Sequence, residues 1–349
     1  MNIQSTIERR PAGAQAAAPG PRQLASQLRP FMKAQAARSV WELAVTLVPF
    51  FGVLVATLWT VSAGYWIALA LVPVAGLLLL RTFIIQHDCG HGAFLNKRTS
   101  NDRLGRALGI LTFTPYDCWR RAHTLHHGST GNLDARGFGD VDTLTVREFR
   151  ARGWFGRLLY RAYRHPVVML GVGPAYLFLL RHRLPIGLMK EGAQYWVSAL
   201  ATNLATAGFL AALMAFFGIG TTLLVVIPTV LVAATAGVWL FYVQHQFEAA
   251  HWDRRKDWEF HEAALRGSSH LDLPQPLRWF TGNIGIHHVH HLASRIPFYR
   301  LPSVLKAFPQ LREINRMTMP QTFRPLVLAL WDEDQRRLVS FREAARARR

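Results

Sequence analysis

The chain has 349 residues, half of them hydrophobic, with 40 Lys and Arg against 21 Asp and Glu. The net charge of +19 could indicate nucleic-acid binding, but no compact basic fold or recognition motif is visible, so we expect no nucleic-acid partner. The only cysteines, Cys89 and Cys118, are too few for a disulfide framework, and the lack of a C-x-x-C motif excludes a zinc ribbon.

The first part of the chain predicts a tail followed by a helical hairpin. Residues 1–30 are rich in Ala, Gln, Pro and Gly, which is typical of a disordered basic tail, and we expect residues 31–349 to form a single membrane domain. Residues 43–80 carry no charge, so this segment has room for two bilayer crossings of about 20 residues each. We place these spans at 40–61 and 65–85, joined by a tight turn.

The second part repeats this arrangement after a long basic segment. Within that segment, residues 166–180 are apolar but too few to cross a bilayer, and basic residues flank them, so we expect a helix in the membrane interface. Residues 192–247 contain no Asp, Glu, Lys or Arg. We place two further spans at 194–216 and 223–243, with an uncharged turn at 218–222.

These elements predict an all-α membrane protein with four transmembrane helices in two hairpins. A cytoplasmic helical cap and interfacial helices would carry the polar segments. Both hairpin turns lack charge, whereas the segments between and after the hairpins are basic. Because Lys and Arg are enriched on the cytoplasmic side of membrane proteins, we expect both termini and the polar segments in the cytoplasm.

Histidines cluster in three short boxes within the polar segments. Residues 123–127 and 287–291 both read H-x-x-H-H, and residues 87–91 hold two histidines four apart. On a helix, positions i, i+3 and i+4 share one face, so the imidazoles of a box can converge on one place. A ninth candidate stands at the end of the fourth span. The predicted metal ligands are His87, His91, His123, His126, His127, His245, His287, His290 and His291.

Nine imidazoles are about twice what one structural zinc requires, so we expect two metal ions. Nitrogen ligands with open positions suit iron and dioxygen chemistry, whereas zinc would support only hydrolysis. The remaining histidines are weaker candidates for metal ligands. His251 and His288 stay open as ligands, and His288 should point away from the box around its helix. Ordinary surface or core roles are expected for His165, His182, His261 and His270.

The boxes resemble those of the integral-membrane fatty acid desaturases. The resemblance rests on HDCGH at 87–91, HTLHH at 123–127 and GNIGIHHVHHL at 282–292, and it extends from about residue 81 to 299. The segments PYDCWRRAH at 115–123 and SRIPFYRL at 294–301 are similar to the bacterial and plastid Delta-12 (omega-6) acyl-lipid type.

The resemblance implies a chemistry and a set of partners. In this family the box histidines bind two irons, and the segment containing His245 supplies a further ligand. O2 is the co-substrate, and ferredoxin or a small haem cytochrome supplies two electrons. The product is a cis double bond in a fatty acyl chain. No haem-cytochrome motif is apparent in this chain, so the donor should be a separate protein. The acyl carrier, whether lipid, CoA or acyl-carrier protein, stays open.

Charged residues near the boxes are candidates for supporting roles. Carboxylates commonly hold metal-bound imidazoles in place, and the candidates are Asp88, Asp134, Asp140, Asp142 and Glu248. Asp88 could equally cap a helix or pair with an arginine. The arginines that flank the boxes could meet an acidic electron donor or a lipid phosphate, or simply be solvated at the membrane surface; these are Arg120, Arg121, Arg295 and Arg300.

Two other functions fit parts of the pattern. A di-iron hydroxylase or ketolase acting on alkanes, sterols or carotenoids has similar boxes, and the outcome depends on small shifts near the metal. A membrane metal transporter is a more distant alternative. Transport requires polar ligands at mid-membrane depth, whereas the histidines here gather outside the spans.

Overall fold

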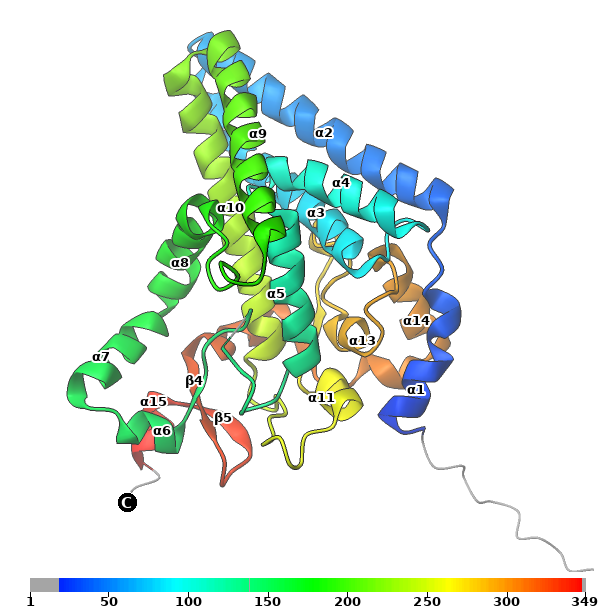
Figure 1. Cartoon of the computed structure of the whole chain (residues 1–349), viewed down its shortest axis with the longest axis vertical. Coiled ribbons are helices and arrows are strands. Elements are labelled where there is room, and N and C mark those ends of the chain that lie inside the picture. The colour runs from blue at the N-terminus through cyan, green and yellow to red at the C-terminus, as the bar shows by residue number, and fades with distance from the viewer. Residues whose placement is uncertain (1–18, 138, 347–349) are drawn as a thin grey trace, which may run out of the picture.

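The computed structural model describes residues 19–137 and 139–346, and most of these residues are helical. Four helices are long and apolar enough to cross a membrane, as predicted. The first hairpin consists of α2 (Ala36–Ser62) and a second helix that begins as η2 (Trp66–Leu71) and continues as α3 (Val72–His91). The second consists of α9 (Ala193–Phe217) and α10 (Ile219–His245). The tips of both hairpins lie together at the top of Figure 1.

The turn of the second hairpin is shorter than the expected loop at 218–222. Only Gly218 separates α9 from α10, and its φ of 82° lies in the left-handed region that favours glycine. The helices also extend further at their other ends than the predicted spans. Both α3 and α10 continue until they end on histidines of the predicted site, His91 and His245. The spans therefore deliver these side chains directly.

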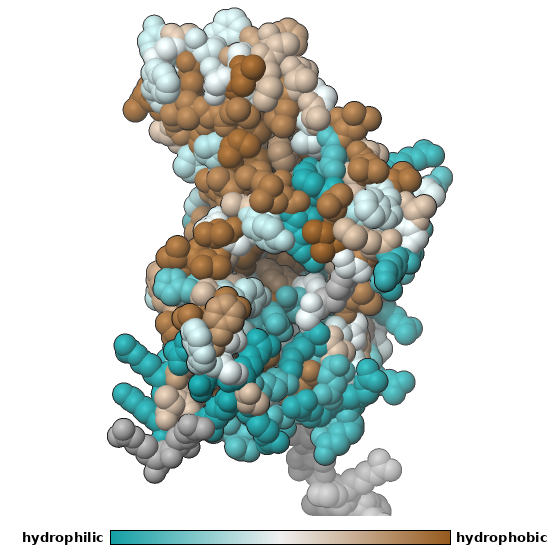
Figure 2. All heavy atoms as spheres, turned by 60° about the vertical axis from the view of Figure 1, so that its left-hand side comes forward, coloured by the Kyte–Doolittle hydropathy of each residue, from teal (hydrophilic) through white to brown (hydrophobic). Residues whose placement is uncertain are grey.

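The outer surface of the hairpins suits a lipid environment. Large apolar side chains are exposed along α2 and α9, including Val48, Trp59, Leu204 and Phe216. Figure 2 shows that hydrophobic residues cover the upper part of this face, whereas hydrophilic residues gather over the lower part. Water would disfavour so much exposed apolar surface, so the upper part is the membrane-embedded part.

Close packing holds the two hairpins together along α3 and α10. A Cβ added to Gly76 of α3 would lie 2.5 Å from a methyl group of Val232 on α10, so only glycine permits this approach. At the lower end of the first hairpin, a buried ion pair joins Glu42 of α2 to Arg81 of α3. The Arg81 guanidinium also donates to Thr46 Oγ1, at 3.0 Å, and stacks on the Trp279 ring. These partners compensate for the desolvation of the two charges.

Short helices and loops form the cap below the spans. The helices nearest the histidines are α4 (Arg98–Leu111), α5 (Tyr116–Ser129), α11 (Phe260–Arg266), α12 (Leu277–Phe280), α13 (His287–Leu292) and α14 (Leu301–Ala307). At the periphery lie α6 (Val146–Ala151), α7 (Trp154–Tyr163) and α15 (Phe341–Arg346). In the cap, α5 and α13, which carry two of the histidine boxes, lie near the lower ends of α3 and α10 (Figure 1).

Two small sheets, which the sequence analysis does not predict, brace the cap. One contains β1 (Leu144–Thr145), β4 (Leu328–Asp332) and β5 (Arg337–Ser340), with β1 parallel and β5 antiparallel to β4. The other pairs β2 (His270–Asp272) in parallel with β3 (Arg316–Thr318). They tie the C-terminal segment to the loops around the histidines and leave the all-α class unchanged.

The expected disordered tail at 1–30 is wrong for its last part, and residues 1–18 lie outside the described residues. Pro21–Gln27 forms α1, and Arg29–Phe31 forms a further helical turn. Leu24 and Leu28 are buried in the same hydrophobic cluster as Leu265 of α11 and Leu292 of α13. Burial of these two side chains offsets the low apolar content that predicted disorder.

The expected interfacial segment at 166–180 is helical. It contains π-helical turns at Val168–Val172 and Tyr176–Leu180, on either side of α8 (Gly173–Ala175). Val172, Tyr176 and Leu180 are exposed. An apolar helical face outside the four spans supports the predicted contact with the membrane interface.

Candidate metal centre

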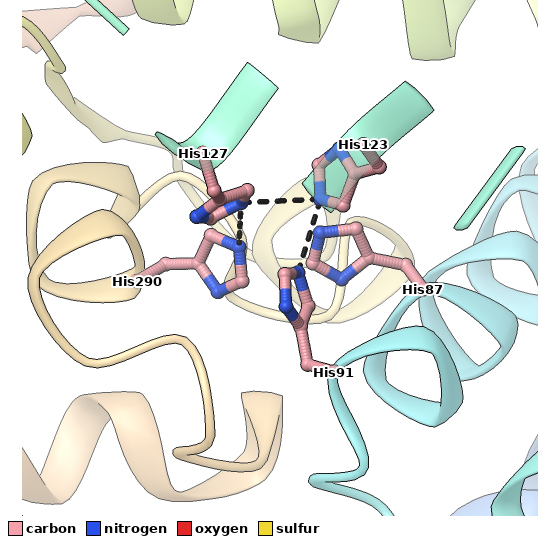
Figure 3. A group of neighbouring side chains, drawn as sticks. All are labelled: His87, His91, His123, His127 and His290. Atoms are coloured by element: carbon pink, nitrogen blue, oxygen red, sulfur yellow. Dashed lines mark hydrogen bonds between the residues drawn. The ribbon is translucent and has the colours of Figure 1, made fainter. Parts of the chain in front are cut away.

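The nine predicted histidines form two adjacent groups below the spans. His87, His91, His123, His127 and His290 make up one, which we call the five-histidine group. Figure 3 shows their rings pointing toward one another from three different helices. The second, the four-histidine group, contains His126, His245, His287 and His291. Within each group the candidate ligand atoms all lie within 4.8 Å of one another.

Helix geometry decides which histidine enters which group. On α5, His123 and His127 are one helical turn apart and both join the five-histidine group, whereas His126 joins the other group. On α13 the i, i+4 pair goes to the other group: His287 and His291 join the four-histidine group, and His290 joins the five-histidine group. Each H-x-x-H-H box therefore serves two places rather than one, because positions i and i+4 align better than i and i+3 on a helix of 3.6 residues per turn.

The two groups share a boundary. The rings of His127 and His291 stack with their centroids 4.0 Å apart and their planes 7° apart, although they belong to different groups. The rings of His126 and His127 are 5.5 Å apart, and those of His290 and His291 are 5.8 Å apart. This spacing suits two metal ions held close together.

Distances between ring nitrogens test whether a metal fits. Nε2 of His123 lies 3.0 Å from Nε2 of His91 and 3.1 Å from Nε2 of His127, and the His290–His127 distance is also 3.1 Å (Figure 3). In the other group, Nε2 of His287 lies 3.0 Å from that of His245 and 3.1 Å from that of His291. Nitrogens at adjacent corners of a metal site with bonds of about 2.1 Å lie about 3 Å apart. Both groups fit.

Burial keeps these imidazoles in the form that binds metal. Desolvation disfavours the imidazolium and lowers the pKa of His123, His127, His287, His290 and His291 well below the usual value, and neighbouring histidines lower it further. In their neutral form, the rings present Nε2 lone pairs that point toward one another and repel, because there are not enough N–H groups to form a hydrogen bond at every contact. A cation at each centre removes this repulsion.

Carboxylates support the centre at two of the five expected positions. Asp140 makes a short contact with Nδ1 of His126, and Asp88 Oδ1 lies 3.4 Å from Nδ1 of His87. The second oxygen of Asp88 accepts from the backbone N–H of Phe298, at 2.7 Å, which ties the first box to the segment after the third. A carboxylate at Nδ1 fixes the ring orientation and leaves Nε2 for the metal.

The other three carboxylates have different roles. Asp134 pairs with Arg254, and Glu248 pairs with Arg324 and Arg337. Asp142 is exposed, and its backbone rather than its carboxylate makes the contacts to Tyr160, Tyr163 and Arg164. Asp134 and Glu248 therefore stabilise the cap through these ion pairs instead of orienting a candidate ligand, and the Asp142 carboxylate does neither.

The six remaining histidines lie outside both groups. Nε2 of His288 contacts the carbonyl of Leu311, at 2.8 Å, so this ring points away from the centre as expected. His251 pairs with Asp253 instead, at 2.6 Å. His270 contacts the carbonyl of Arg312 through Nδ1. Like these three, His165, His182 and His261 belong to neither group.

Aromatic rings that the sequence analysis did not single out line the centre. Trp119 stacks on His123, with centroids 4.6 Å apart, and Phe241 packs 5.0 Å from His126 and 5.2 Å from His245. Trp119 precedes His123 by one helical turn, and Phe241 precedes His245 by the same interval. That spacing is the signal that could have identified them.

The flanking arginines differ in their partners. Arg120 pairs with Asp102 and Arg121 with Glu191. Arg300 donates to the carbonyls of Pro30 and Lys33 and so anchors the N-terminal segment, whereas Arg295 is exposed. Cys89 and Cys118 are both free thiols.

Comparison with known proteins gives consistent matches. The family model for fatty acid desaturase matches residues 64–322. A fatty acid desaturase of Bacillus subtilis (strain 168) is 39% identical over 323 residues, which cover 92% of this chain and 91% of the relative. An sn-1 acyl-lipid omega-3 desaturase (ferredoxin) of Synechocystis is 30% identical over a match that covers 74% of this chain and 72% of the relative. From the same organism, an sn-1 oleoyl-lipid 12-desaturase is 28% identical over a match that covers 70% of this chain and 71% of the relative.

Proposed function

Because the chain belongs to the fatty acid desaturase family, whose members are oxidoreductases, we propose that it is a membrane di-iron desaturase. It would use O2 and two electrons to place a cis double bond in a fatty acyl chain, in the Delta-12 (omega-6) position. The observation that carries the proposal is the pair of adjacent histidine groups, with five and four ring nitrogens in reach of one centre each. A pair of irons bound there would supply the activation of O2 and the removal of two hydrogens.

The side chains of this protein would hold and orient that pair. The five-histidine group would bind one iron and the four-histidine group the other, each through Nε2. Asp140 would keep Nδ1 of His126 engaged, so that its Nε2 faces the centre. The complete burial of the four-histidine group would exclude water from that side.

The position of the centre supports an acyl substrate. All nine histidines lie at one end of the four spans rather than at mid-membrane depth, which favours an enzyme over a transporter. An acyl chain is insoluble in water, and a site at the membrane face can take it from the bilayer. The basic segments around the site support a cytoplasmic orientation of the site and of both termini.

The relatives support the finer assignments. One relative is named as an oleoyl-lipid 12-desaturase, which together with the box-two and box-three segments supports the Delta-12 type and a lipid substrate. Another is named as a ferredoxin-dependent desaturase, which supports ferredoxin as the electron donor. A small haem cytochrome is the other donor to be tested.

Fatty acid profiling of a bacterial host that lacks polyunsaturated acids tests this proposal. We expect linoleic acid to accumulate when the chain is expressed with a ferredoxin and its reductase, and not with the matched His126→Ala variant. A double bond at another position would reject the Delta-12 assignment alone. A hydroxylated product without a new double bond would reject desaturation and favour a hydroxylase.

A further inference from the structure

We propose that Arg164, a buried arginine that directly follows α7, is a positioning residue for the four-histidine group. Its guanidinium would fix the segment that carries Asp140 relative to the end of α10 that carries His245. The inference rests on the proposed function, because it concerns how the chain holds one of the two proposed irons. It goes beyond that function by assigning a role to a side chain that belongs to neither histidine group.

Arg164 is buried without a counter-ion. Its exposed fraction is 3%, and within residues 19–137 and 139–346 no carboxylate oxygen lies at ion-pair distance from it. Removing a charge from water is costly unless polar partners replace the water. Here the partners are five neutral oxygens, 2.8–3.1 Å from Nη1 or Nη2: the carbonyls of Asp142 and Leu328, and the side-chain oxygens of Thr143, Tyr242 and Gln246.

The first segment that Arg164 binds carries the carboxylate behind His126. Nη1 of Arg164 donates to Thr143 Oγ1, at 3.1 Å, and to the carbonyl of the preceding residue, at 3.0 Å. Thr143 follows Asp140 by three positions. On the other side of Asp140, a Cβ added to Gly139 would lie 2.8 Å from a backbone carbonyl of α5, the helix that carries His126. Asp140 is thus fixed from both sides in contact with Nδ1 of His126.

The second segment is the end of α10, which carries His245. Nη2 of Arg164 donates to the hydroxyl of Tyr242, at 3.1 Å, and to Oε1 of Gln246, at 2.8 Å. Tyr242 precedes His245 by three positions and Gln246 follows it directly, and both are 1% exposed. Nε2 of His245 lies 3.2 Å from Nε2 of His126, so a shift of the helix end would change the spacing of two predicted ligands.

The two segments also contact each other beside this guanidinium. Thr143 Oγ1 lies 3.2 Å from Gln246 Oε1, and the guanidinium donates to both oxygens. One nitrogen serves each segment, which the rigid planar fork of arginine permits and the single ammonium of lysine does not. Through its carboxylate the first segment supports His126, whose ring centroid lies 4.6 Å from that of His245 on the second. The guanidinium therefore sets the separation of the two segments on which this ring pair depends.

A purely structural role is the alternative, because Nη2 also donates to the carbonyl of Leu328, where β4 begins. In that case, the loss of Arg164 would loosen the C-terminal sheet and lower the stability of the cap without selecting either histidine group. The two roles differ in the metal site that they affect, so metal binding separates them.

Cobalt binding to the full chain in detergent tests the inference without requiring the reaction. Co²⁺ accepts the same nitrogen ligands as iron, and its visible spectrum reports its coordination. We expect the wild type to bind two Co²⁺ ions. Arg164→Lys keeps the charge but loses the fork, so we expect it to bind one of these ions about tenfold more weakly. Equal affinities in the two proteins, or equal weakening of both sites, would overturn the proposal.

Arg183→Lys is the matched control. Arg183 also donates to neutral oxygens, and none of the residues that provide them adjoins a histidine of either group; they are Phe113, Phe178 and Asn203. We expect this variant to leave both cobalt affinities unchanged, even where thermal unfolding shows it to be as destabilised as Arg164→Lys. The same selective weakening in both variants would show that the effect is structural and would overturn the proposal.

A double variant identifies the weakened site. Asp140→Asn removes the charge that supports His126, so Arg164→Lys should weaken cobalt binding less in that background than in the wild type. Fully independent effects would overturn the proposal.

A further variant covers the case in which Arg164→Lys does not fold. Thr143→Val removes one contact of the guanidinium and should weaken the same site by about threefold, and unchanged binding there would overturn the proposal. A wild type that binds both Co²⁺ ions and shows these selective losses, but forms no double bond when loaded with iron, would count against the proposed function alone.

Discussion

The two histidine groups have the same chemistry but different surroundings. In the five-histidine group, His91, His123 and His127 are only half-buried, and a groove reaches His91. All members of the four-histidine group are buried, and Asp140 and Phe241 pack against His126. The group with fewer imidazoles is thus the one that is sealed and supported from behind, whereas the larger group forms the accessible side.

This difference follows from where each helix delivers its side chains. Two pairs of histidines at i and i+4, on α3 and α5, make up most of the five-histidine group, and three of these four side chains are only half-buried. The four-histidine group takes its i, i+4 pair from α13, every residue of which is buried. Pairs of histidines at i and i+4 therefore contribute to both the half-exposed group and the buried group, and the helix that carries a pair decides which group it joins.

The largest effect should come from removing one ligand of either group. His290→Ala and His126→Ala each leave a centre short of a nitrogen and open a cavity, so we expect each to lower desaturase activity more than about 100-fold. Both variants should also lose part of the bound iron, measured by elemental analysis of the purified protein.

His288→Gln is the matched control for this experiment. It alters a histidine of the same helix that is equally buried but contacts the Leu311 carbonyl instead of the centre, and an amide N–H can replace that contact. We expect near-normal iron content. Full activity in His290→Ala or His126→Ala would remove that residue from the ligand set.

The two histidine groups should lose their iron to a chelator at different rates. Because the five-histidine group is half-exposed and the four-histidine group is buried, we expect a chelator to remove iron in two phases. The fast phase should correspond to the accessible group, and Asp140→Asn, which loosens the sealed group, should bring the phases together. A single phase in the wild type would contradict the proposed asymmetry.

Much of this arrangement could be predicted from the sequence. Charge-free segments longer than a core helix can be stable only in a membrane, so residues 43–80 and 192–247 predicted two hairpins. Helical spacing predicted that the box histidines converge, but it was wrong that each H-x-x-H-H box meets at one place, because each box divides between the two groups. The isolated His245 could be placed because it follows the fourth span directly. These features depend on local periodicity and on length.

Other features depend on contacts between distant segments, which composition does not encode. Leu24 and Leu28 look like part of a polar tail until α11 and α13 bury them. Strands of two to five residues, such as β1 and β4, form only because their partners lie nearby. The selection of Asp140 over Asp134 and Glu248 also depends on which arginines the fold brings close.

Removal of the carboxylate behind His126 should have an intermediate effect. Asp140→Asn keeps the shape of the side chain but loses the charge that orients the imidazole, and such changes typically cost about 10–100-fold in metal affinity or activity. We expect this loss in iron affinity, measured by competition with a chelator. Asp142→Asn, an exposed neighbour without a ligand contact, should leave the affinity unchanged. Equal affinities in the two variants would show that Asp140 does not support the ligand.

The smallest effect should be a pH dependence of stability in the iron-free protein. Burial lowers the folded-state pKa of His127 and His291 well below 6.5, whereas the unfolded chain takes up these protons near pH 6.5. The unfolded state thus binds more protons below that pH, so stability should fall as the pH drops, by about 1.4 kcal/mol per pH unit for each such histidine.

Thermal unfolding of chelator-treated protein between pH 8 and 5 measures this slope. His291 lies in the sealed group and His127 in the accessible one, and the two rings stack on each other. Because desolvation is the main cause of both lowered pKa values, His291→Gln and His127→Gln should each flatten the profile by the contribution of one histidine. An unchanged profile in either variant would show that burial does not keep that imidazole neutral in the iron-free protein.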